Sequence, residues 1–298
     1  TLSNRGARLV QLVAKRQNLS LLLDTEQVPT ELIDQFCIGG TVGPFAGRLR
    51  QIATTNGQPA VLLHGNEAAL HRADWMLERG NQPSAATYSI SRRHGEGGLP
   101  GDRDFRAAYT LSDNSLMIDL SVTTTHDTPI SLTNHAYFTL GATSASALSL
   151  QINAQSVLLT DGEQCATGGS MPVADTPLDF VRERLLGDAL TAYPDGLDHS
   201  YVLASGNRDA LAPDHVASLT NRAKGVSLDL ATTQPCLQVY TASQLTSPLR
   251  PFTAICLEAQ GFPNGPNHAL GRRHSWLAAG QTTTQRIVYR INERSLRH

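Results

Sequence analysis

The chain has 298 residues, of which 40% are hydrophobic and 17% are charged, so a sizeable core is expected and wholesale disorder is excluded. Its formal net charge of -2 at pH 7 and its pI near 6.5 argue against a broad electrostatic affinity for nucleic acid or anionic membranes. No apolar run approaches the roughly 20 residues that a membrane-spanning helix needs.

Helical periodicity is scarce along the chain, and short strand-like runs are frequent. The helix candidates are Thr30–Phe36 and Phe180–Leu190. The predicted strands are, in chain order, Arg8–Ala14, Leu19–Asp24, Ala60–His64, Ala107–Leu111, Ser115–Thr124, Ile130–Leu140, Ala147–Ile152, Ser156–Thr160, Ser200–Leu203, His215–Thr220, Gly225–Ala231, Leu237–Thr241, Thr253–Gln260 and Gln285–Ile291.

Turn-forming residues separate these runs. The turn signals are Asn56–Gly57, Asp113–Asn114, Asp161–Gly162, Asp195–Gly196 and the segment Asn264–Pro266. Many short strands with regular turns are typical of an all-β sandwich or barrel. We find no internal repeat, low-complexity tract or linker, so we expect one domain over residues 1–298.

The segment Ser131–Gly141, which contains most of the predicted strand Ile130–Leu140, carries a histidine in an unusual setting. Alternation places an apolar row on one face and Thr133, His135, Tyr137 and Thr139 on the other. A polar row centred on an imidazole, opposite a core-facing row, predicts a proton-transfer group that faces a cavity.

Three further strand-like segments combine polar and apolar faces. In one segment, Glu258 stands on the strand face opposite Leu257. In the second, Gln238 and Tyr240 alternate with Leu237 and Val239. In the third, Asp198 stands at the entry to a strand, after a turn. Buried carboxylates and imidazoles are costly unless they are paired or face a wet cavity. We therefore expect these segments to share one polar concavity.

The four cysteines, Cys37, Cys165, Cys236 and Cys256, show no close pairing and no metal-type spacing. Buried free thiols are expected, which favours a reducing compartment and a cytoplasmic location. The chain begins at Thr1 without a methionine, which leaves open a short missing N-terminal stretch or a removed export signal.

Several motifs, taken in order, resemble the galactose mutarotase (aldose 1-epimerase) family. They are Leu63–Gly65, Leu132–Phe138, Gly196–His199, Thr233–Pro235, Gln238–Thr241 and Cys256–Gln260 followed by Pro263. The resemblance covers nearly the whole chain. It implies a large antiparallel β-sandwich (a supersandwich), a sugar site on the concave face, and neither cofactor nor metal.

The resemblance also implies roles for individual residues. Glu258 corresponds to the general base that takes the proton from the anomeric O1 hydroxyl of a pyranose, and His135 to the general acid that protonates the ring oxygen O5. Such chemistry needs an acid and a base beside the acetal carbon. The substrate-binding residues that it implies are Arg48, His64, Asp198, Gln238, Tyr137 and Tyr240.

The chain departs from the family pattern around the rim of the expected site. Gly47 stands where asparagine is common before the arginine, and Asn66 stands where a second glycine is usual. These departures affect the expected sugar preference more than the expected reaction.

The sequence leaves alternatives open. A hexose-phosphate 1-epimerase would need basic residues at the rim, and a non-catalytic sugar-binding module would have no need of both His135 and Glu258. A cupin-like metal site would use His64, His135 and Glu258.

The expected partner is a monosaccharide, and the expected assembly is a monomer or a homodimer. The basic candidates for a phosphate are Arg50, Arg72, Arg92, Arg93 and Arg103.

Overall fold

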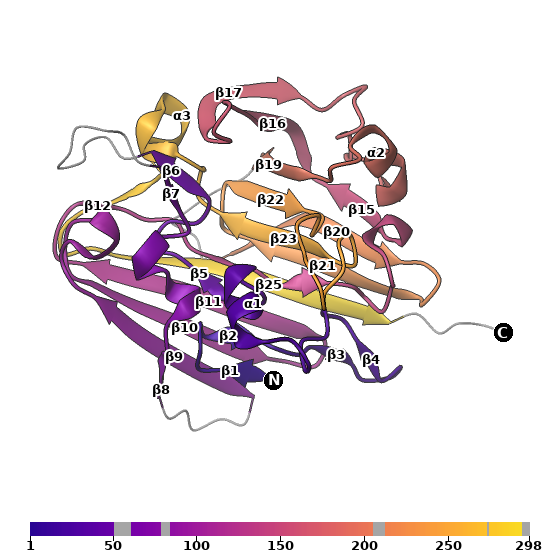
Figure 1. Cartoon of the computed structure of the whole chain (residues 1–298), viewed down its shortest axis with the longest axis horizontal. Coiled ribbons are helices and arrows are strands. Elements are labelled where there is room, and N and C mark those ends of the chain that lie inside the picture. Colours follow the sequence, from indigo (N-terminus) through magenta and orange to yellow (C-terminus); the bar gives the residue numbers. More distant parts are fainter. Residues whose placement is uncertain (51–60, 79–83, 205–211, 273, 294–298) are drawn as a thin grey trace.

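Two antiparallel β-sheets form the framework of the computed structural model, which describes residues 1–50, 61–78, 84–204, 212–272 and 274–293. In Figure 1 the larger sheet forms one layer and the smaller sheet, with β22 (Cys236–Tyr240) and β23 (Ile255–Gln260) in orange, lies over part of it. The predicted all-β sandwich is therefore confirmed.

The larger sheet has nine strands in the described residues. Its long strands β10 (Arg103–Leu111) and β11 (Ser115–Thr124) alternate buried and more exposed side chains, because one face packs into the core and the other meets solvent. In spatial order the strands are β18 (Arg184–Leu185), β15 (Ser149–Ile152), β20 (Asp214–Asn221), β21 (Val226–Thr232), β25 (Thr282–Glu293), β11 (Ser115–Thr124), β10 (Arg103–Leu111), β9 (Ala85–Arg92) and β8 (Met76–Glu78).

The smaller sheet has six strands in the described residues. Leu237, Val239 and Leu257 point from it into the core shared with the larger sheet. Because side chains alternate along a strand, Gln238 and Glu258 point out of the opposite face. In spatial order the strands are β14 (Tyr137–Phe138), β23 (Ile255–Gln260), β22 (Cys236–Tyr240), β19 (Asp198–Leu203), β16 (Ala154–Thr160) and β17 (Ala166–Pro172).

Short strand pairs and helices complete the fold. The pairs are β1 (Leu2–Ser3) with β2 (Arg8–Leu9), β3 (Val13–Ala14) with β4 (Leu19–Ser20), β5 (Thr41–Val42) with β13 (Thr133–Asn134), β6 (Arg48–Arg50) with β7 (Val61–Leu63), and β12 (Thr128–Pro129) with β24 (Trp276–Leu277). The described α-helices are α1 (Thr30–Gln35), α2 (Leu186–Ala192) and α3 (Ala269–Arg272).

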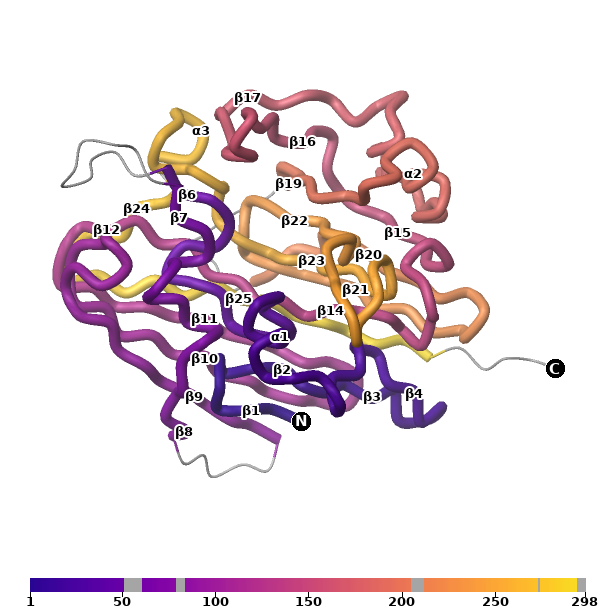
Figure 2. The backbone as a smooth tube through the Cα atoms, viewed as in Figure 1, coloured from indigo at the N-terminus to yellow at the C-terminus, as the bar shows by residue number. Residues whose placement is uncertain are grey.

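The N-terminal segment runs across the sandwich and brings the β6–β7 hairpin next to the smaller sheet (Figure 2). The backbone N–H of Asn264, just beyond β23, donates to the carbonyl of Arg48 in β6 at 2.9 Å. Residues far apart in sequence are thereby held over the outer face of the smaller sheet.

Most predicted strands exist, with shifted ends, and β11 has the predicted bounds. The helix predicted at Phe180–Leu190 starts only at Leu186, because Phe180 accepts a hydrogen bond from Ile152 and Arg184–Leu185 pairs with β15. Strands β9 and β17 were not predicted, since small polar residues and glycines obscure their alternation. The Asn56–Gly57 turn and Ala60 lie outside the described residues.

The prediction of one continuous strand over Ser131–Gly141 is wrong. The chain forms β13 on β5, crosses, and then forms β14 on β23. Every residue from Ser131 to Leu140 is buried, because the N-terminal segment covers this crossing. The predicted polar face toward a wet cavity therefore does not form, and Thr133 and Thr139 are buried.

A buried ion-pair network ties the N-terminal segment to α1. Arg5 Nη2 and Arg8 Nη2 donate to the two carboxylate oxygens of Asp34 at 2.6 and 2.7 Å. Burial alone would raise the pKa of Asp34, but the hydrogen bonds from the two arginines outweigh it and lower that pKa.

We expect Asp34→Ala to lower the free energy of unfolding by about 3 kcal/mol, because Arg8, only 6% exposed, loses its carboxylate. Since the folded-state pKa of Asp34 is lowered, the wild-type advantage is present above the unfolded-state pKa of about 3.9 and is lost as the pH falls through the folded value. Urea unfolding at neutral and acid pH, with exposed Asp113→Ala as control, tests both statements. An equal loss at every pH would contradict the assignment.

Candidate active site

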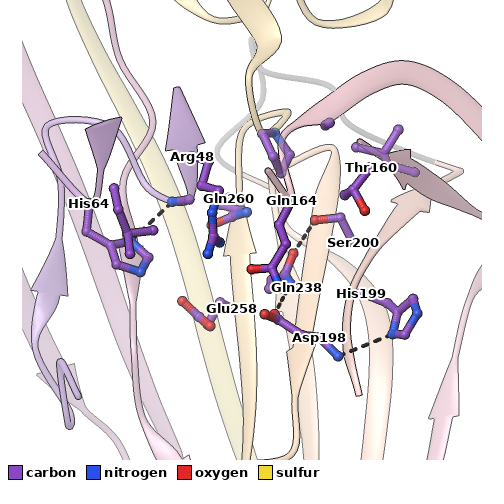
Figure 3. A pocket seen from close by; sticks show the side chains of 15 residues that line it. Arg48, His64, Thr160, Gln164, Asp198, His199, Ser200, Gln238, Glu258 and Gln260 are labelled. Carbon is purple, nitrogen blue, oxygen red and sulfur yellow. Dashed lines mark hydrogen bonds between the residues drawn. The ribbon is translucent and has the colours of Figure 1, made fainter. Parts of the chain in front are cut away.

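Three adjacent strands of the smaller sheet present polar side chains on its outer face. Ser200 in β19, Gln238 in β22 and Glu258 in β23 lie opposite one another in register. With Asp198 and Gln260 they line a cavity of about 180 Å³ (Figure 3). This is smaller than the roughly 300–1,000 Å³ of sites for drug-sized ligands, so the cavity suits one small polar molecule.

The β6–β7 hairpin forms the opposite wall with Gly47, Arg48 and His64. Gly47 has φ +75°, and its N–H donates to His64 Nδ1 at 3.2 Å, while the N–H of His64 donates to the carbonyl of Gly47 at 3.1 Å. Because Nδ1 accepts, the neutral ring carries its proton on Nε2. Burial, with smaller effects of Arg48 and Arg72, lowers the pKa of His64 to about 4. His64 is therefore a neutral donor in the neutral pH range.

His135 lies at the crossing between β13 and β14, where its backbone is fixed on both sides. Its N–H donates to the carbonyl of Gly40 at 2.9 Å, and its carbonyl accepts from the N–H of Gly39 at 2.8 Å. His135 Nε2 is 3.5 Å from Glu258 Oε1, and its ring centroid is 6.1 Å from that of His64. An imidazole and a carboxylate thus adjoin at the edge of the cavity.

Burial shifts the pKa values of this pair in opposite directions. It raises the pKa of Glu258 well above its ordinary value, and the nearby carboxylate of Asp198 adds to this effect. Burial also lowers the pKa of His135, and the imidazoles of His64 and His71 lower it further. Burial therefore favours the neutral forms of both groups, in which the proton lies on Glu258.

A chain of hydrogen bonds links the polar groups on the other side of the cavity. Ser200 Oγ donates to Gln238 Oε1, and Gln238 Nε2 donates to Asp198 Oδ1 at 2.6 Å (Figure 3). Burial raises the pKa of Asp198, although the hydrogen bond from Gln238 and the charge of Arg48 oppose the shift. The arrangement suits hydroxyl groups that both donate and accept.

The structure brings most of the predicted site residues together. Arg48, His64, Asp198, Gln238 and Glu258 line the cavity. His135 is not among the lining side chains but adjoins two of them, and it is 6% exposed. Their individual roles remain predictions.

Tyr137 and Tyr240, predicted to contact the substrate, do not line the cavity. Tyr137 stacks on His135 with ring centroids 5.1 Å apart, and its hydroxyl donates to the carbonyl of Phe36 at 2.9 Å. Tyr240 packs edge-on against both rings, and its hydroxyl accepts from the N–H of Gln244 at 2.9 Å. The two rings pack against His135 and their hydroxyls are held by backbone groups, so a contact of either ring with the substrate stays a prediction.

Other lining residues were not predicted. Gln260 lies two residues after Glu258, and Ser200 two after Asp198, so strand alternation alone places each on the same face as a predicted site residue. Thr160 and Gln164 come from β16 and the turn that follows it, for which the sequence carries no comparable signal. The unpredicted polar lining residues are Thr160, Gln164, His199, Ser200 and Gln260.

The arginines considered for a phosphate are mostly engaged elsewhere. Arg50 pairs with Asp161 and Glu163, and Arg93 with Asp102. Arg92 and Arg103 donate to backbone carbonyls. Arg72 is exposed, is not a lining residue, and has no side-chain hydrogen bond or ion pair within the described ranges.

Within the part of the chain that the structure describes, no three His, Cys, Asp or Glu side chains are arranged to hold a metal ion. All four cysteines are buried, and none of them forms a disulfide within those same residues. None of the described helices has the length and apolar character needed to cross a bilayer.

Comparison with known sequences identifies relatives. The family profile described as Aldose 1-epimerase matches residues 1–290. The aldose 1-epimerase of Haemophilus influenzae is 30% identical over 261 residues, which cover 78% of this chain and 74% of the relative. The human galactose mutarotase is 28% identical over 220 residues, covering 69% of this chain and 62% of the relative.

Comparison with solved structures agrees on the fold. The GalM/aldose epimerase homologue from C. elegans superposes with a TM-score of 0.86 at 24% identity and covers 97% of this chain and 94% of its own. Galactose 1-epimerase from Lactobacillus acidophilus gives 0.82 at 24% identity, covering 97% and 90%. The chain therefore belongs to the aldose 1-epimerase family, whose relatives named here as epimerases and mutarotases are isomerases.

Proposed function

We propose that this protein interconverts the α and β anomers of a free hexose, such as galactose or glucose, by acid–base ring opening. The observation that carries the proposal is the 3.5 Å separation of His135 Nε2 and Glu258 Oε1 beside a small polar cavity. The anomeric hydroxyl and the ring oxygen of a pyranose share one carbon, so two groups this close can serve both oxygens.

The reaction starts from the form of the pair in which the shared proton lies on His135. Glu258 then takes the proton from the O1 hydroxyl while His135 donates its proton to O5. The C1–O5 bond breaks, its electron pair stays on O5, and O1 becomes the aldehyde oxygen. After rotation about C1–C2, O5 attacks the other face of the aldehyde, and both proton transfers run in reverse. The pair thus ends each turnover with the proton count with which it began.

The remaining lining residues stabilise the charge that develops on the sugar and hold the sugar in place. The Nε2–H of His64, set by the Gly47 hydrogen bond, donates to an oxygen at the reacting end, where donors stabilise developing negative charge. Arg48 also lines the cavity, makes no ion pair within the described residues, and is available for the same task. Asp198 and Gln238 bind sugar hydroxyls.

A free sugar fits this lining better than a phosphorylated one. Asp198 and Glu258 contribute carboxyl groups to the wall, and Arg50, the candidate nearest in sequence to the site, is neutralised by two carboxylates. A dianionic phosphate would meet like charges there. A sugar-binding module without turnover would gain nothing from an acid and a base held in contact.

Polarimetry tests the proposal. Fresh α-glucose and α-galactose should relax to their equilibrium rotation faster with the wild-type protein than in buffer. No acceleration with any of several free aldoses, together with acceleration for hexose 6-phosphates, would transfer the proposal to the phosphorylated substrate. No acceleration with either group of sugars would reject it.

We expect a bell-shaped pH dependence of kcat/KM, because the His135–Glu258 pair must hold one proton. As the pH falls, a second proton enters and activity is lost. The lowered pKa of His135 places this acid limb below pH 6.5. As the pH rises, the last proton leaves, and the raised pKa of Glu258 places this limb above 4.5.

His64 and Asp198 contribute to the acid limb as well, because protonation breaks the Gly47 hydrogen bond to His64 and neutralises Asp198. Initial polarimetric rates, corrected for the spontaneous reaction at each pH, give the profile. An acid limb centred at or above pH 6.5 would contradict the lowered pKa of His135.

A further inference from the structure

We infer that Ser200 is a positioning residue, which holds the Gln238 amide so that Gln238 and Asp198 together bind one face of the sugar. The inference rests on the proposed function and adds to it a residue that acts through another. It depends on the hydrogen-bond chain that runs across strands β19 and β22.

Sheet register places these groups side by side. Ser200 is directly opposite Gln238, and Asp198 is opposite Tyr240 on the same pair of strands. Ser200 Oγ donates to Gln238 Oε1, and Gln238 Nε2 reaches diagonally to Asp198 Oδ1 at 2.6 Å. Figure 3 shows Ser200, Gln238 and Asp198 joined in this order along the cavity wall.

The charge of Asp198 and the hydroxyl of Ser200 fix the amide from both ends. An ionised carboxylate only accepts hydrogen bonds, so the Nε2 end of Gln238 must face Asp198. The Oε1 end then faces Ser200, which is 7% exposed and supplies the matching donor. Without that hydroxyl, Oε1 loses its partner and the flexible glutamine side chain regains rotamers.

The hydrogen-bond chain from Ser200 through Gln238 to Asp198 leaves two polar groups open to a ligand. Gln238 keeps its second N–H, and Asp198 keeps Oδ2, as no other side-chain contact of these groups is found within the described residues. A donor and an acceptor next to each other match sugar hydroxyls, each of which accepts one hydrogen bond and donates another. The ligand that these groups match is therefore a neutral sugar ring. The contact already exists in the ground-state complex, before any covalent bond is made or broken.

Since this contact is the same in the ground state and the transition state, its loss should raise KM and leave kcat nearly unchanged. We expect Ser200→Ala to raise KM about fivefold, with kcat within about twofold of wild type. Ser200→Thr keeps the hydroxyl on a strand that accepts threonine, and should restore KM to within about twofold. Ser156→Ala, on neighbouring β16, is the matched control.

A double-mutant cycle separates indirect from direct action. In a Gln238→Ala background, Ser200→Ala should cause no further increase in KM. The inference is overturned if the KM of Ser200→Ala equals that of wild type, or if the same increase persists without Gln238. Wild-type protein that accelerates no mutarotation would instead reject the proposed function, so the two failures are distinguishable.

Discussion

Replacing Glu258 by glutamine is expected to lower kcat by about 10²–10⁴-fold, the usual contribution of a positioned general base. Glutamine keeps the size of the side chain and its hydrogen-bonding atoms but cannot take the proton from O1. KM should change little, because Asp198, Gln238 and Arg48 still line the cavity. Polarimetric progress curves at several sugar concentrations give both constants.

The folding stability of this variant provides the control. Glu258 is buried, which disfavours the charged carboxylate and raises its pKa, so the neutral amide should not destabilise the protein. Urea unfolding should give a free energy at least equal to that of wild type, and exposed Glu26→Gln should leave both activity and stability unchanged. A fully active Glu258→Gln protein would show that another group is the base.

Strand alternation explains why much of the fold and one wall of the site were predictable. In β22 and β23, apolar residues at every second position must face the core, and this leaves Gln238 and Glu258 on the outer face whatever the details of packing. Adjacent pairing of the two strands then brings the two side chains together. The same reasoning, carried two residues further, would have included Gln260 and Ser200.

The surroundings of His135 were not predictable from its own segment. Alternation from Ser131 to Gly141 suggested one strand with a wet face, but the chain crosses between sheets and is covered by residues near Leu21 and Gly39. Coverage by a distant segment leaves no periodic signal. For the same reason, Tyr137 was expected on the cavity wall and lies instead behind the imidazole.

The residues of the smaller sheet and His135 are held in place in different ways, and this difference has a consequence for the proposed reaction. Sheet residues such as Gln238 are held by regular pairing, whereas His135 is held by two backbone hydrogen bonds and by aromatic rings. Burial by these rings favours the neutral imidazole. When protonated beside Glu258, His135 is therefore a stronger acid than a free histidine, as protonation of a weakly basic ring oxygen requires.

Replacing His135 by asparagine is expected to lower kcat by about 10²–10⁴-fold, because the imidazole 3.5 Å from Glu258 is the proposed proton donor to O5. The loss of stacking on Tyr137 also costs stability, so urea unfolding must accompany the kinetics. His215→Asn, on the solvent side of the larger sheet, is the control.

The pH profile distinguishes loss of the acid from mere disturbance of the site. Without His135, the residual reaction depends only on ionised Glu258, so its rate should rise with pH through the raised pKa of Glu258 and show no falling basic limb. His135→Gln, whose amide N–H comes near the position of Nε2 but holds no transferable proton, should behave in the same way. Retention of a bell-shaped profile and of substantial activity in a folded His135→Gln protein would assign the acid to another residue.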